Sequence, residues 1–517
     1  MPGRPAGPGM PPVPRHIHKN RRAGIRRFAE RGRADLSALE QITGAVASAL
    51  WGRPLVAALL GTHVFLTFRL RGVQQYIGKA IRLSVRREKG VEGGVSPFSA
   101  LMTSLAATIG TGNVVGVATA VAAGGPGAVL WMWISGLFGM ATKYAEALLS
   151  VKYRVRRADG SFAGGPMVVM ERALHLRPLG CVFAFFTAAA ALGVGGMVQS
   201  NSAAGLLDRS LHIPPLICGL ALAGLGGCVI IGGIGSIARV CRPLIPAAGG
   251  LFVAANLFIL LAGWRQIPRT LLLIGTSAFT GQAAVGGFVG AMAKDAVRYG
   301  IARGLFSNEA GLGSSPIVDA AARCGDPARQ ALVSSSGVFW DTVVMAALTG
   351  VMIVNTGLWR TGGDGGELIG RVFGLIPAVG PALLGVSLFL FAFATIIGWS
   401  YYAESAVHYL FGERAVRPYQ LLYLILTALA PVLPMTLVWN LSDIANAMMA
   451  LPNLFSLLLL NGTVREETRR SLWSGRLFRA EGLAKAKNPP GTAAGGTGKQ
   501  AVRVRSSQAP ARRQSDR

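Results

Sequence analysis

Long apolar runs recur along this chain, separated by shorter segments rich in Arg, Lys, Gly and Pro. A helix that crosses the hydrocarbon core of a bilayer needs about 20 predominantly apolar residues, and eleven runs approach or exceed that length. They lie at residues 51–69, 98–123, 127–150, 181–206, 214–233, 242–262, 270–293, 332–356, 383–410, 419–437 and 439–462. The pattern therefore predicts an all-α integral membrane protein with about eleven transmembrane helices.

Two of these runs are interrupted by glycine clusters. One is Ile-Gly-Thr-Gly-Asn-Val-Val-Gly at residues 109–116, and the other is Phe-Thr-Gly-Gln-Ala-Ala-Val-Gly-Gly at residues 279–287. Glycine costs about 1 kcal/mol relative to alanine in a helix interior, so both clusters predict broken helices. Broken helices survive inside a membrane where their free backbone groups are buried or line a cavity. A pair of them in corresponding halves of a chain is typical of the binding site of a secondary transporter.

The distribution of charge indicates a membrane protein and not a nucleic-acid-binding protein. The formal net charge is +28, yet only 14% of the residues are charged and the mean hydropathy is +0.47. Basic residues concentrate in the tails and in the segments 70–97, 151–180 and 294–331, whereas the alternate loops are poor in them. Cytoplasmic loops carry such an excess. We therefore expect a multi-pass protein of the bacterial inner (plasma) membrane with a cytoplasmic C-terminus.

One transporter domain is predicted at residues 51–463, between two basic and mostly disordered tails at residues 1–50 and 464–517. Eleven spans place the N-terminus outside, although residues 1–33 carry nine Lys and Arg against one acid. We interpret that segment as an extension that lacks a core. No apolar run with a cleavage site precedes the first span, so no signal peptide is predicted. The five cysteines show no CxxC spacing and are interpreted as small core residues.

The first glycine cluster holds the first candidate ligands: Gly110, Gly112 and Asn113. A broken helix frees carbonyls that can bind a cation and amides that can bind a carboxylate. The side chain of Asn113 can both donate and accept hydrogen bonds. The alternative is close helix packing, because Gly112 and Gly116 are four residues apart.

Further polar side chains interrupt other apolar runs. Gln282 lies beside the second glycine cluster, and Gln199 lies in the fourth run; each could bind an amino acid or bridge two helices. The hydroxyl oxygen of Thr395 suits a hard cation such as Na⁺, although Thr in a membrane helix often bonds to its own backbone. Trp399 follows one turn later. Asp341 is an intramembrane carboxylate, and such a group binds a cation, pairs with a neighbour or carries a proton.

Enzyme motifs are missing from the sequence. There is no GxSxG, no Walker A motif and no HExxH, and the six histidines lie in the tails or near the ends of the runs. We therefore expect neither an enzyme nor an organic cofactor. Lys143 and Glu146, three residues apart, are interpreted as an ion pair at the cytoplasmic end of the third run. A channel or an amino-acid sensor is the alternative from another functional class.

Several longer strings are similar to those of a known family. They are Gly-Gly-Pro-Gly-Ala-Val-Leu-Trp-Met-Trp at residues 124–133, Gly-Met-Ala-Thr-Lys-Tyr-Ala-Glu at 139–146, Gly-Gly-Pro-Met at 164–167, Arg-Gly-Leu-Phe-Ser-Asn-Glu-Ala-Gly-Leu-Gly-Ser at 303–314, Phe-Ala-Phe-Ala-Thr-Ile-Ile-Gly-Trp-Ser-Tyr-Tyr at 391–402 and Leu-Pro-Asn at 451–453. Together they resemble the sodium:alanine (alanine or glycine:cation) symporter family, and the likeness runs from about residue 51 to 463.

This resemblance implies a leucine-transporter-like fold, in which one extra N-terminal helix precedes a 5+5 inverted repeat with discontinuous first and sixth core helices. It implies uptake of small neutral amino acids, chiefly alanine or glycine, coupled to Na⁺. The implied substrate pocket comprises Gly110, Gly112, Asn113, Gln199, Gln282 and Trp399. The implied Na⁺ site uses Thr395 and the carbonyls of Ile109 and Gly110.

One departure from the family pattern bears on ion coupling. The family typically has Ser-Thr where this chain has Ala394-Thr395. One hydroxyl is therefore missing from the implied Na⁺ site. The sequence leaves open whether Na⁺ binds more weakly, whether another group completes the site, or whether H⁺ is the coupling ion.

Overall fold

The computed structural model describes residues 37–86, 93–157, 160–279, 296, 300–301, 303–305, 307–433 and 435–479. Nearly all of its regular structure is helical, with one short antiparallel pair of strands. The helices are α2 (Arg53–Arg69), α3 (Ile77–Ser84), α4 (Pro97–Thr108), α5 (Val117–Gly124), α6 (Gly127–Lys152), α7 (Pro166–Ala173), α8 (Arg177–Ala190), α9 (Val198–Leu211), α10 (Pro215–Ile230), α11 (Gly233–Ala262), α12 (Ile267–Phe279), α14 (Pro316–Ala320), α15 (Pro327–Val338), α16 (Ala347–Thr356), α17 (Gly365–Phe373), α18 (Gly380–Phe411), α19 (Val416–Leu429), α20 (Met435–Leu459) and α21 (Asn461–Thr468), and the strands are β1 (Val155–Arg156) and β2 (Phe162–Ala163).

The described residues include seven helices that are long and apolar enough to cross a membrane, or eight if one bent pair counts as a span. The seven are Ser37–Arg69, Arg177–Leu211, Gly233–Ala262, Pro327–Thr356, Gly380–Phe411, Glu413–Val432 and Met435–Leu459. The prediction of an all-α membrane protein is therefore confirmed, while the count of eleven spans and the repeat arrangement stay predictions. The first span begins at Ser37, inside the segment that the sequence analysis assigned to the N-terminal extension.

The outer surface of the bundle is apolar. Large apolar side chains on α10, α11, α12 and α19 are more than half exposed, among them Ile217, Leu261, Leu272 and Leu421. In a bilayer such side chains contact lipid tails, which are as apolar as they are.

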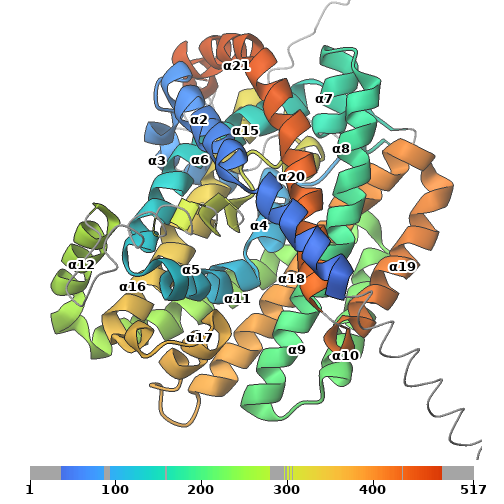
Figure 1. Cartoon of the computed structure of the whole chain (residues 1–517). Coiled ribbons are helices and arrows are strands. Elements are labelled where there is room, and N and C mark those ends of the chain that lie inside the picture. The colour runs from blue at the N-terminus through green and yellow to red at the C-terminus, as the bar shows by residue number, and fades with distance from the viewer. Residues whose placement is uncertain are drawn as a thin grey trace, which may run out of the picture.

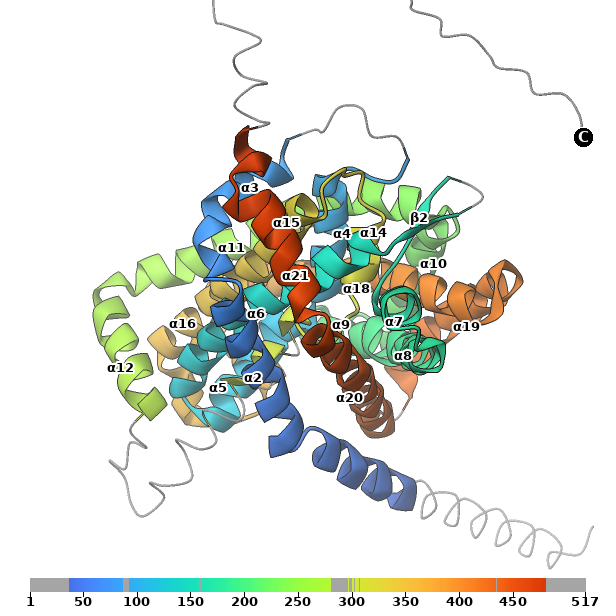
Figure 2. The same ribbon diagram turned by 90° about the horizontal axis from the view of Figure 1, so that it is seen from above.

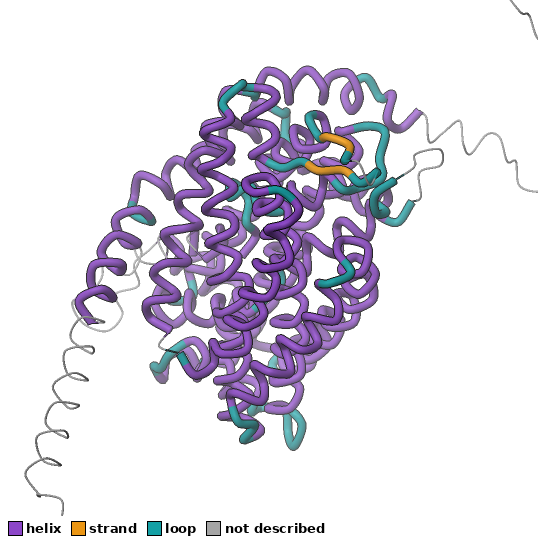
Figure 3. The backbone as a smooth tube through the Cα atoms, turned by 90° about the vertical axis from the view of Figure 1, so that its right-hand side faces the viewer, coloured by secondary structure: helices purple, strands orange, loops and turns teal. Residues whose placement is uncertain are grey.

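The two ends of the bundle differ in the elements that they carry. Figure 1 shows α3, α7 and α21 at one end and α17 at the opposite end. Figure 2 shows α3, α21 and β2 from above, and Figure 3 shows the two strands near the same end of the molecule. These elements come from the basic segments of the sequence, so the basic segments gather at one end as the charge pattern predicts.

Near the centre of the bundle, the α4–α5 pair is bent by 55°. Pro97 begins α4, and the Ser96 hydroxyl caps it by accepting a hydrogen bond from the Ser99 amide at 3.1 Å. The helix ends at Thr108 because Ile109 is extended, with φ −76° and ψ 91°. The chain becomes helical again at a π-helical turn, η2 (Gly112–Gly116). The sequence-predicted break at residues 109–116 therefore lies where the structure bends.

The second break predicted from the sequence, at residues 279–287, lies outside the described residues except for Phe279. A different interruption of helical structure, called the second break from here on, covers the helical turn that ends at residue 308 and the turns up to residue 315, just before α14. The backbone of Glu309, Gly311 and Gly313 has positive φ angles of 54°, 89° and 83°. Gly313 is required there, because a Cβ would lie 2.7 Å from the Pro166 Cγ and 2.8 Å from the Asn453 Cγ. This break falls in the segment 294–331, which the charge pattern predicts to be a loop, yet Leu305, Leu312 and Val318 are buried. Residues 309–315 are indeed turns and irregular backbone, but they form a buried loop and not an exposed one.

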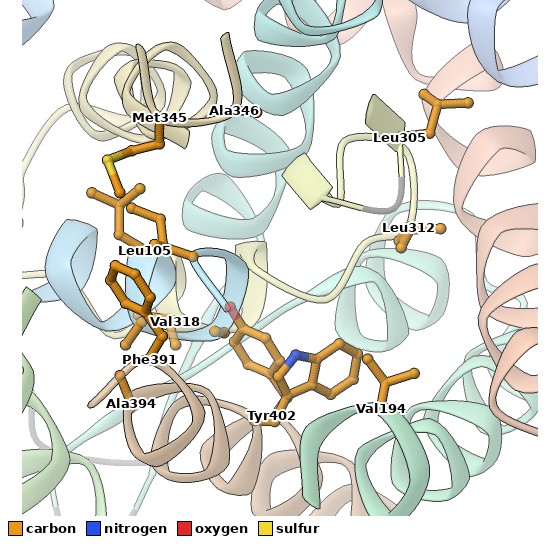
Figure 4. Close-up of a cluster of buried hydrophobic side chains, with 14 of the residues drawn as sticks. Leu105, Val194, Leu305, Leu312, Val318, Met345, Ala346, Phe391, Ala394 and Tyr402 are labelled. Carbon is orange, nitrogen blue, oxygen red and sulfur yellow. The ribbon is translucent and has the colours of Figure 1, made fainter. Parts of the chain in front are cut away.

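Helix α18 packs closely on α4 and fixes the position of the first break. A Cβ on Gly398 would lie 2.8 Å from the Ala107 amide nitrogen, so the two backbones nearly touch. Figure 4 shows Leu105 of α4, Phe391 of α18 and Leu312 of the second break around one buried cluster. The apolar core thus lies directly beside the two breaks.

Candidate functional site

The two breaks meet at a buried network of polar side chains around Asp341. The Asn113 amide donates to the Asp341 Oδ1 at 2.8 Å and to the Asp341 backbone carbonyl at 3.0 Å. The Ser307 hydroxyl lies 3.0 Å from both the Asn113 Oδ1 and the Asp341 Oδ2, and the Thr342 hydroxyl donates to the same Oδ2 at 2.8 Å. All four side chains are buried. The network therefore joins the first break, the second break and the helix that runs from Pro327 to Thr356.

Asn113 and Asp341 are thus brought together, although they are far apart in the sequence. Sequence analysis missed Ser307 and Thr342. Ser307 belongs to the string 303–314 that carries the family resemblance, so its position in that string was a signal that could have been used. Thr342 gave no comparable signal, because a Thr in an apolar run commonly bonds to its own helix.

Gln199, on α9, forms hydrogen bonds with the first break. Its Oε1 accepts hydrogen bonds from the Thr111 amide at 3.3 Å and from the Thr111 hydroxyl at 3.1 Å. Its Nε2 donates to the Val194 carbonyl at 3.1 Å. Val194 lies in a π-helical segment, η3 (Ala191–Met197), which brings that carbonyl within reach. Gln199 therefore holds the bent backbone of residues 109–111 against α9.

Thr395 contacts the end of α4. Its hydroxyl donates to the Ala106 carbonyl at 3.0 Å, and a Cβ on Gly110 would lie 2.8 Å from the same hydroxyl oxygen. Gly110 thus approaches both Thr395 and Gln199, whose Oε1 would lie 3.1 Å from that Cβ. The structure brings Thr395 beside the end of α4, close to the predicted carbonyls of Ile109 and Gly110. The carbonyl to which its hydroxyl donates, however, is that of Ala106.

Trp399 is buried one turn after Thr395 and packs edge-on against Tyr402, with ring centroids 5.3 Å apart. Its Cβ would lie 2.4 Å from a Cβ placed on Gly195, so Gly195 permits the close approach of α18 to η3.

The Asn201 amide donates to the Ala430 carbonyl at 3.3 Å and so bridges two helical segments. Gln282 lies outside the described residues.

The Lys143–Glu146 ion pair predicted from the sequence is replaced by contacts to the second break. The Lys143 Nζ donates to the Asn308 carbonyl at 3.3 Å, where a cation stabilises the end of the preceding helix. The Glu146 Oε1 accepts from the Gly311 amide at 3.0 Å and from the Asn453 amide at 2.6 Å. Both Lys143 and Glu146 are buried. The two charges still attract one another, but among the described residues their direct bonds go to the second break and to Asn453, and the position at the cytoplasmic end stays a prediction.

Four of the strings that carry the family resemblance converge on the second break. Asn453, from Leu-Pro-Asn, also donates to the Gly311 carbonyl at 3.0 Å. The Ser150 hydroxyl donates to the Pro316 carbonyl at 2.7 Å and accepts from the Gly165 amide at 2.7 Å. The strings at residues 139–146, 164–167, 303–314 and 451–453 thus form one structural unit, which explains why they stand out from the apolar background.

The chemistry available at the two breaks is that of oxygen ligands. The described residues contain no group of three or more His, Cys, Asp or Glu that could hold a metal. A cation at the breaks would be held by carbonyl and hydroxyl oxygens around Thr395, or by the Asp341 carboxylate with the Asn113 and Ser307 oxygens. Oxygen ligands suit hard cations.

Comparison with known proteins agrees with this geometry. A model of the sodium:alanine symporter family matches residues 36–474. The chain belongs to the sodium:alanine symporter family. Its membership makes the protein a secondary active amino-acid transporter of the membrane and not an enzyme.

The alignments of this chain with relatives in the sodium:alanine symporter family cover almost the whole length of those relatives. An uncharacterized transporter of Haemophilus influenzae is 44% identical over 436 residues, which are 83% of this chain and 96% of the relative. The sodium/alanine symporter AgcS of Methanococcus maripaludis is 42% identical over 439 residues, with the same two coverages. Among solved structures, MhsT in complex with L-phenylalanine aligns with a TM-score of 0.53 at 16% identity, covering 72% of this chain and 90% of MhsT. This last likeness shows the fold alone.

Proposed function

We propose that the protein imports small neutral amino acids, alanine or glycine, together with Na⁺ by alternating access. The observation that carries the proposal is the contact between the two breaks, where Asn113, Ser307 and Asp341 bond to one another inside the bundle. These contacts place groups from the discontinuous helix pair α4–α5 and from two other segments in one buried site, as expected of a transporter's binding site. Membership of the sodium:alanine symporter family and the 42% identity to AgcS support the substrate and the ion.

The proposed substrate pocket comprises Gly110, Gly112, Asn113, Gln199, Gln282 and Trp399. The bent backbone at Gly110 and Gly112 would bind the amino and carboxylate groups of the substrate. Close packing favours a small side chain, because Gly110 lies against Thr395 and Gln199 and Gly195 lies against Trp399. A bulkier amino acid would have to displace one of these buried side chains.

The proposed Na⁺ site lies between α4 and α18. Thr395 would supply its hydroxyl oxygen, and the backbone from Ala106 to Gly110, including the predicted carbonyls of Ile109 and Gly110, would supply the rest. In the structure the Thr395 hydroxyl donates its hydrogen to the Ala106 carbonyl, which leaves the lone pairs of the hydroxyl oxygen for a cation. Ala394, which lacks the hydroxyl usual in the family, is buried beside Thr395. No organic cofactor is needed.

Asp341 is the proposed site of a further coupling ion. Because its carboxylate can also take up a proton, H⁺ is the alternative coupling ion to Na⁺. Three side chains surround its carboxylate and satisfy it without any basic residue among the hydrogen-bond partners described. The Ser307 hydroxyl has one hydrogen, so it can donate to Asp341 or to Asn113 but not to both at once. Binding of a cation or a proton at Asp341 would therefore redirect the hydrogen bonds that join the two breaks.

The proposed location is the bacterial inner membrane, with α21 and the C-terminus on the cytoplasmic side. The gathering of the basic segments at the end that carries α3 and α21 supports this orientation.

The proposal is tested with purified protein in proteoliposomes. An inward Na⁺ gradient should drive accumulation of labelled alanine, with saturation and with exchange of internal for external alanine. If uptake does not depend on the Na⁺ gradient and is driven by an inward H⁺ gradient, the coupling ion is H⁺ and not Na⁺. Alanine flux that does not saturate and shows no exchange would indicate a channel and would contradict the proposal.

A further inference from the structure

Lys143 places a positive charge beside the polar network around Asp341. Its side chain is buried, and the ammonium nitrogen donates to the Asn308 carbonyl at 3.3 Å. The preceding residue in the chain is Ser307, whose hydroxyl oxygen lies 3.0 Å from the Asp341 Oδ2. The ammonium group thus contacts the residue next to a hydrogen-bond partner of Asp341.

The described interior holds more acidic than basic side chains. Lys143 alone is buried among the Lys and Arg residues that the structure describes, whereas four carboxylates are buried: Glu146, Glu309, Asp319 and Asp341. The charge of Lys143 acts on each of these four carboxylates. Buried charges are screened by salt much less than exposed ones are. The ammonium group therefore offsets part of the negative charge that attracts a cation to Asp341.

Glu146 in turn offsets the charge of Lys143. It lies one turn further along α6, and its Oε1 accepts hydrogen bonds from the Gly311 amide at 3.0 Å and from the Asn453 amide at 2.6 Å. The side-chain oxygen of a glutamine can accept the same two bonds. The charge of Glu146 can therefore be removed while these contacts to the second break are kept.

We propose that Lys143 sets the affinity of Asp341 for the coupling cation and keeps it low enough for the cation to leave. This inference rests on the proposed function, in which Asp341 binds a further coupling ion. A cation at Asp341 is attracted by the carboxylate and repelled by an ammonium group that is covalently part of α6. An ion that is to be transported must be bound and also released. Lys143 thus acts through Asp341 and does not bind the ion itself.

The test is alanine uptake by the purified full-length protein in proteoliposomes, measured over a range of external Na⁺ concentrations. Lys143→Gln removes the repulsion, so the Na⁺ concentration for half-maximal uptake should fall by at least about threefold, the order of effect of one charge acting through the protein interior. The maximal rate should fall too, because the cation leaves more slowly. Glu146→Gln leaves Lys143 less compensated and should raise the half-maximal Na⁺ concentration by at least about twofold.

Two further variants are the controls. Lys143→Arg keeps the charge and should stay near the unaltered half-maximal concentration. Lys152→Gln removes the same charge from the end of α6, where Lys152 is exposed and pairs with Glu467. Water and salt screen a charge at the surface, so Lys152→Gln should change neither the half-maximal concentration nor the maximal rate.

Opposite shifts for Lys143→Gln and Glu146→Gln support the proposal, because damage to the packing would shift both variants in the same direction. An unchanged or higher Na⁺ requirement of folded Lys143→Gln would overturn it. If Lys143→Gln does not fold, Glu146→Gln decides, and a Na⁺ requirement equal to that of Lys152→Gln would overturn the proposal.

The unaltered protein tests the proposed function separately. If its uptake follows H⁺ and not Na⁺, the same shifts are expected in the H⁺ concentration for half-maximal uptake. If its uptake depends on neither cation, the proposed function and this inference are both wrong.

Discussion

Thr395 and Ala394 are neighbours on α18, and only Thr395 has a side-chain oxygen that could bind a cation. Thr395→Val keeps the shape of the side chain and removes that oxygen. Loss of a contact to a charged group costs about 1.5–3 kcal/mol, so the Na⁺ concentration for half-maximal alanine uptake should rise by roughly ten- to a hundredfold. Thr395→Ser, which keeps the oxygen, is the control and should stay near the unaltered value. A Na⁺ dependence unchanged by Thr395→Val would exclude Thr395 as a ligand.

Asp341 differs from Thr395 because it brings a charge into the site. Asp341→Asn keeps the size of the side chain, and the Ser307 and Thr342 hydroxyls can turn to accept from the new amide. We expect ion-driven alanine accumulation to fall at least about tenfold while the protein stays folded. Accumulation is measured in proteoliposomes and folding by thermal unfolding.

Asp319 supplies the matched control for Asp341. It is also a buried carboxylate, but its partners are Gln330 and Ser334, at 2.9 and 2.6 Å. Asp319→Asn should therefore alter stability more than ion dependence. If both substitutions lower the unfolding temperature and leave coupling intact, Asp341 has a structural role.

At the scale of elements, the second break depends on glycine conformations that no other residue adopts without strain. Gly313→Ala places a Cβ 2.7 Å from Pro166 Cγ at a φ of 83°. The left-handed conformation and the overpacking together should lower the free energy of unfolding by about 2–4 kcal/mol. The measurement is thermal unfolding in detergent. Gly275→Ala in α12, where a Cβ meets nothing within 4 Å, should change it little; equal melting of both variants would contradict this account.

The two breaks show how far the sequence could predict the site. The first break was predictable because Gly-Thr-Gly-Asn stands inside a long apolar run and a second glycine cluster interrupts another run in the other half of the chain. The described second break, near residues 309–313, resembled a polar loop because it contains Ser307, Asn308 and Glu309 between arginines. Its burial depends on Lys143 and Asn453, which lie far away in the sequence. Tertiary contacts of this kind leave no periodic signal in the segment itself.

Across the whole molecule, the half-helices α4 and α14 are joined at the end that carries the basic segments. The Val95 amide donates to the Ala321 carbonyl at 3.0 Å, and the Arg323 amide donates to the Val95 carbonyl at 2.6 Å. Arg154, just after α6, donates to the carbonyls of Ala320, Ala322 and Cys324 at 2.6–3.0 Å. The three contacts hold the end of α14, and α4 with it, against the long helix α6. Movement of either half-helix away from α6 must therefore break the bonds of Arg154.

Arg154→Gln is expected to loosen this end of the bundle and leave the opposite end unchanged. Hydrogen–deuterium exchange of the amides in residues 93–97 and 316–324 should become at least about fivefold faster, because each charged hydrogen bond contributes about 1.5–3 kcal/mol. Exchange in α5 and α17 should not change. Arg156→Gln is the control, because Arg156 is exposed on β1, two residues away. Equal exchange in the two variants would mean that Arg154 does not hold the half-helices. Faster exchange confined to Arg154→Gln, together with a higher alanine concentration for half-maximal uptake, would show that this contact keeps this end of the bundle closed while substrate binds.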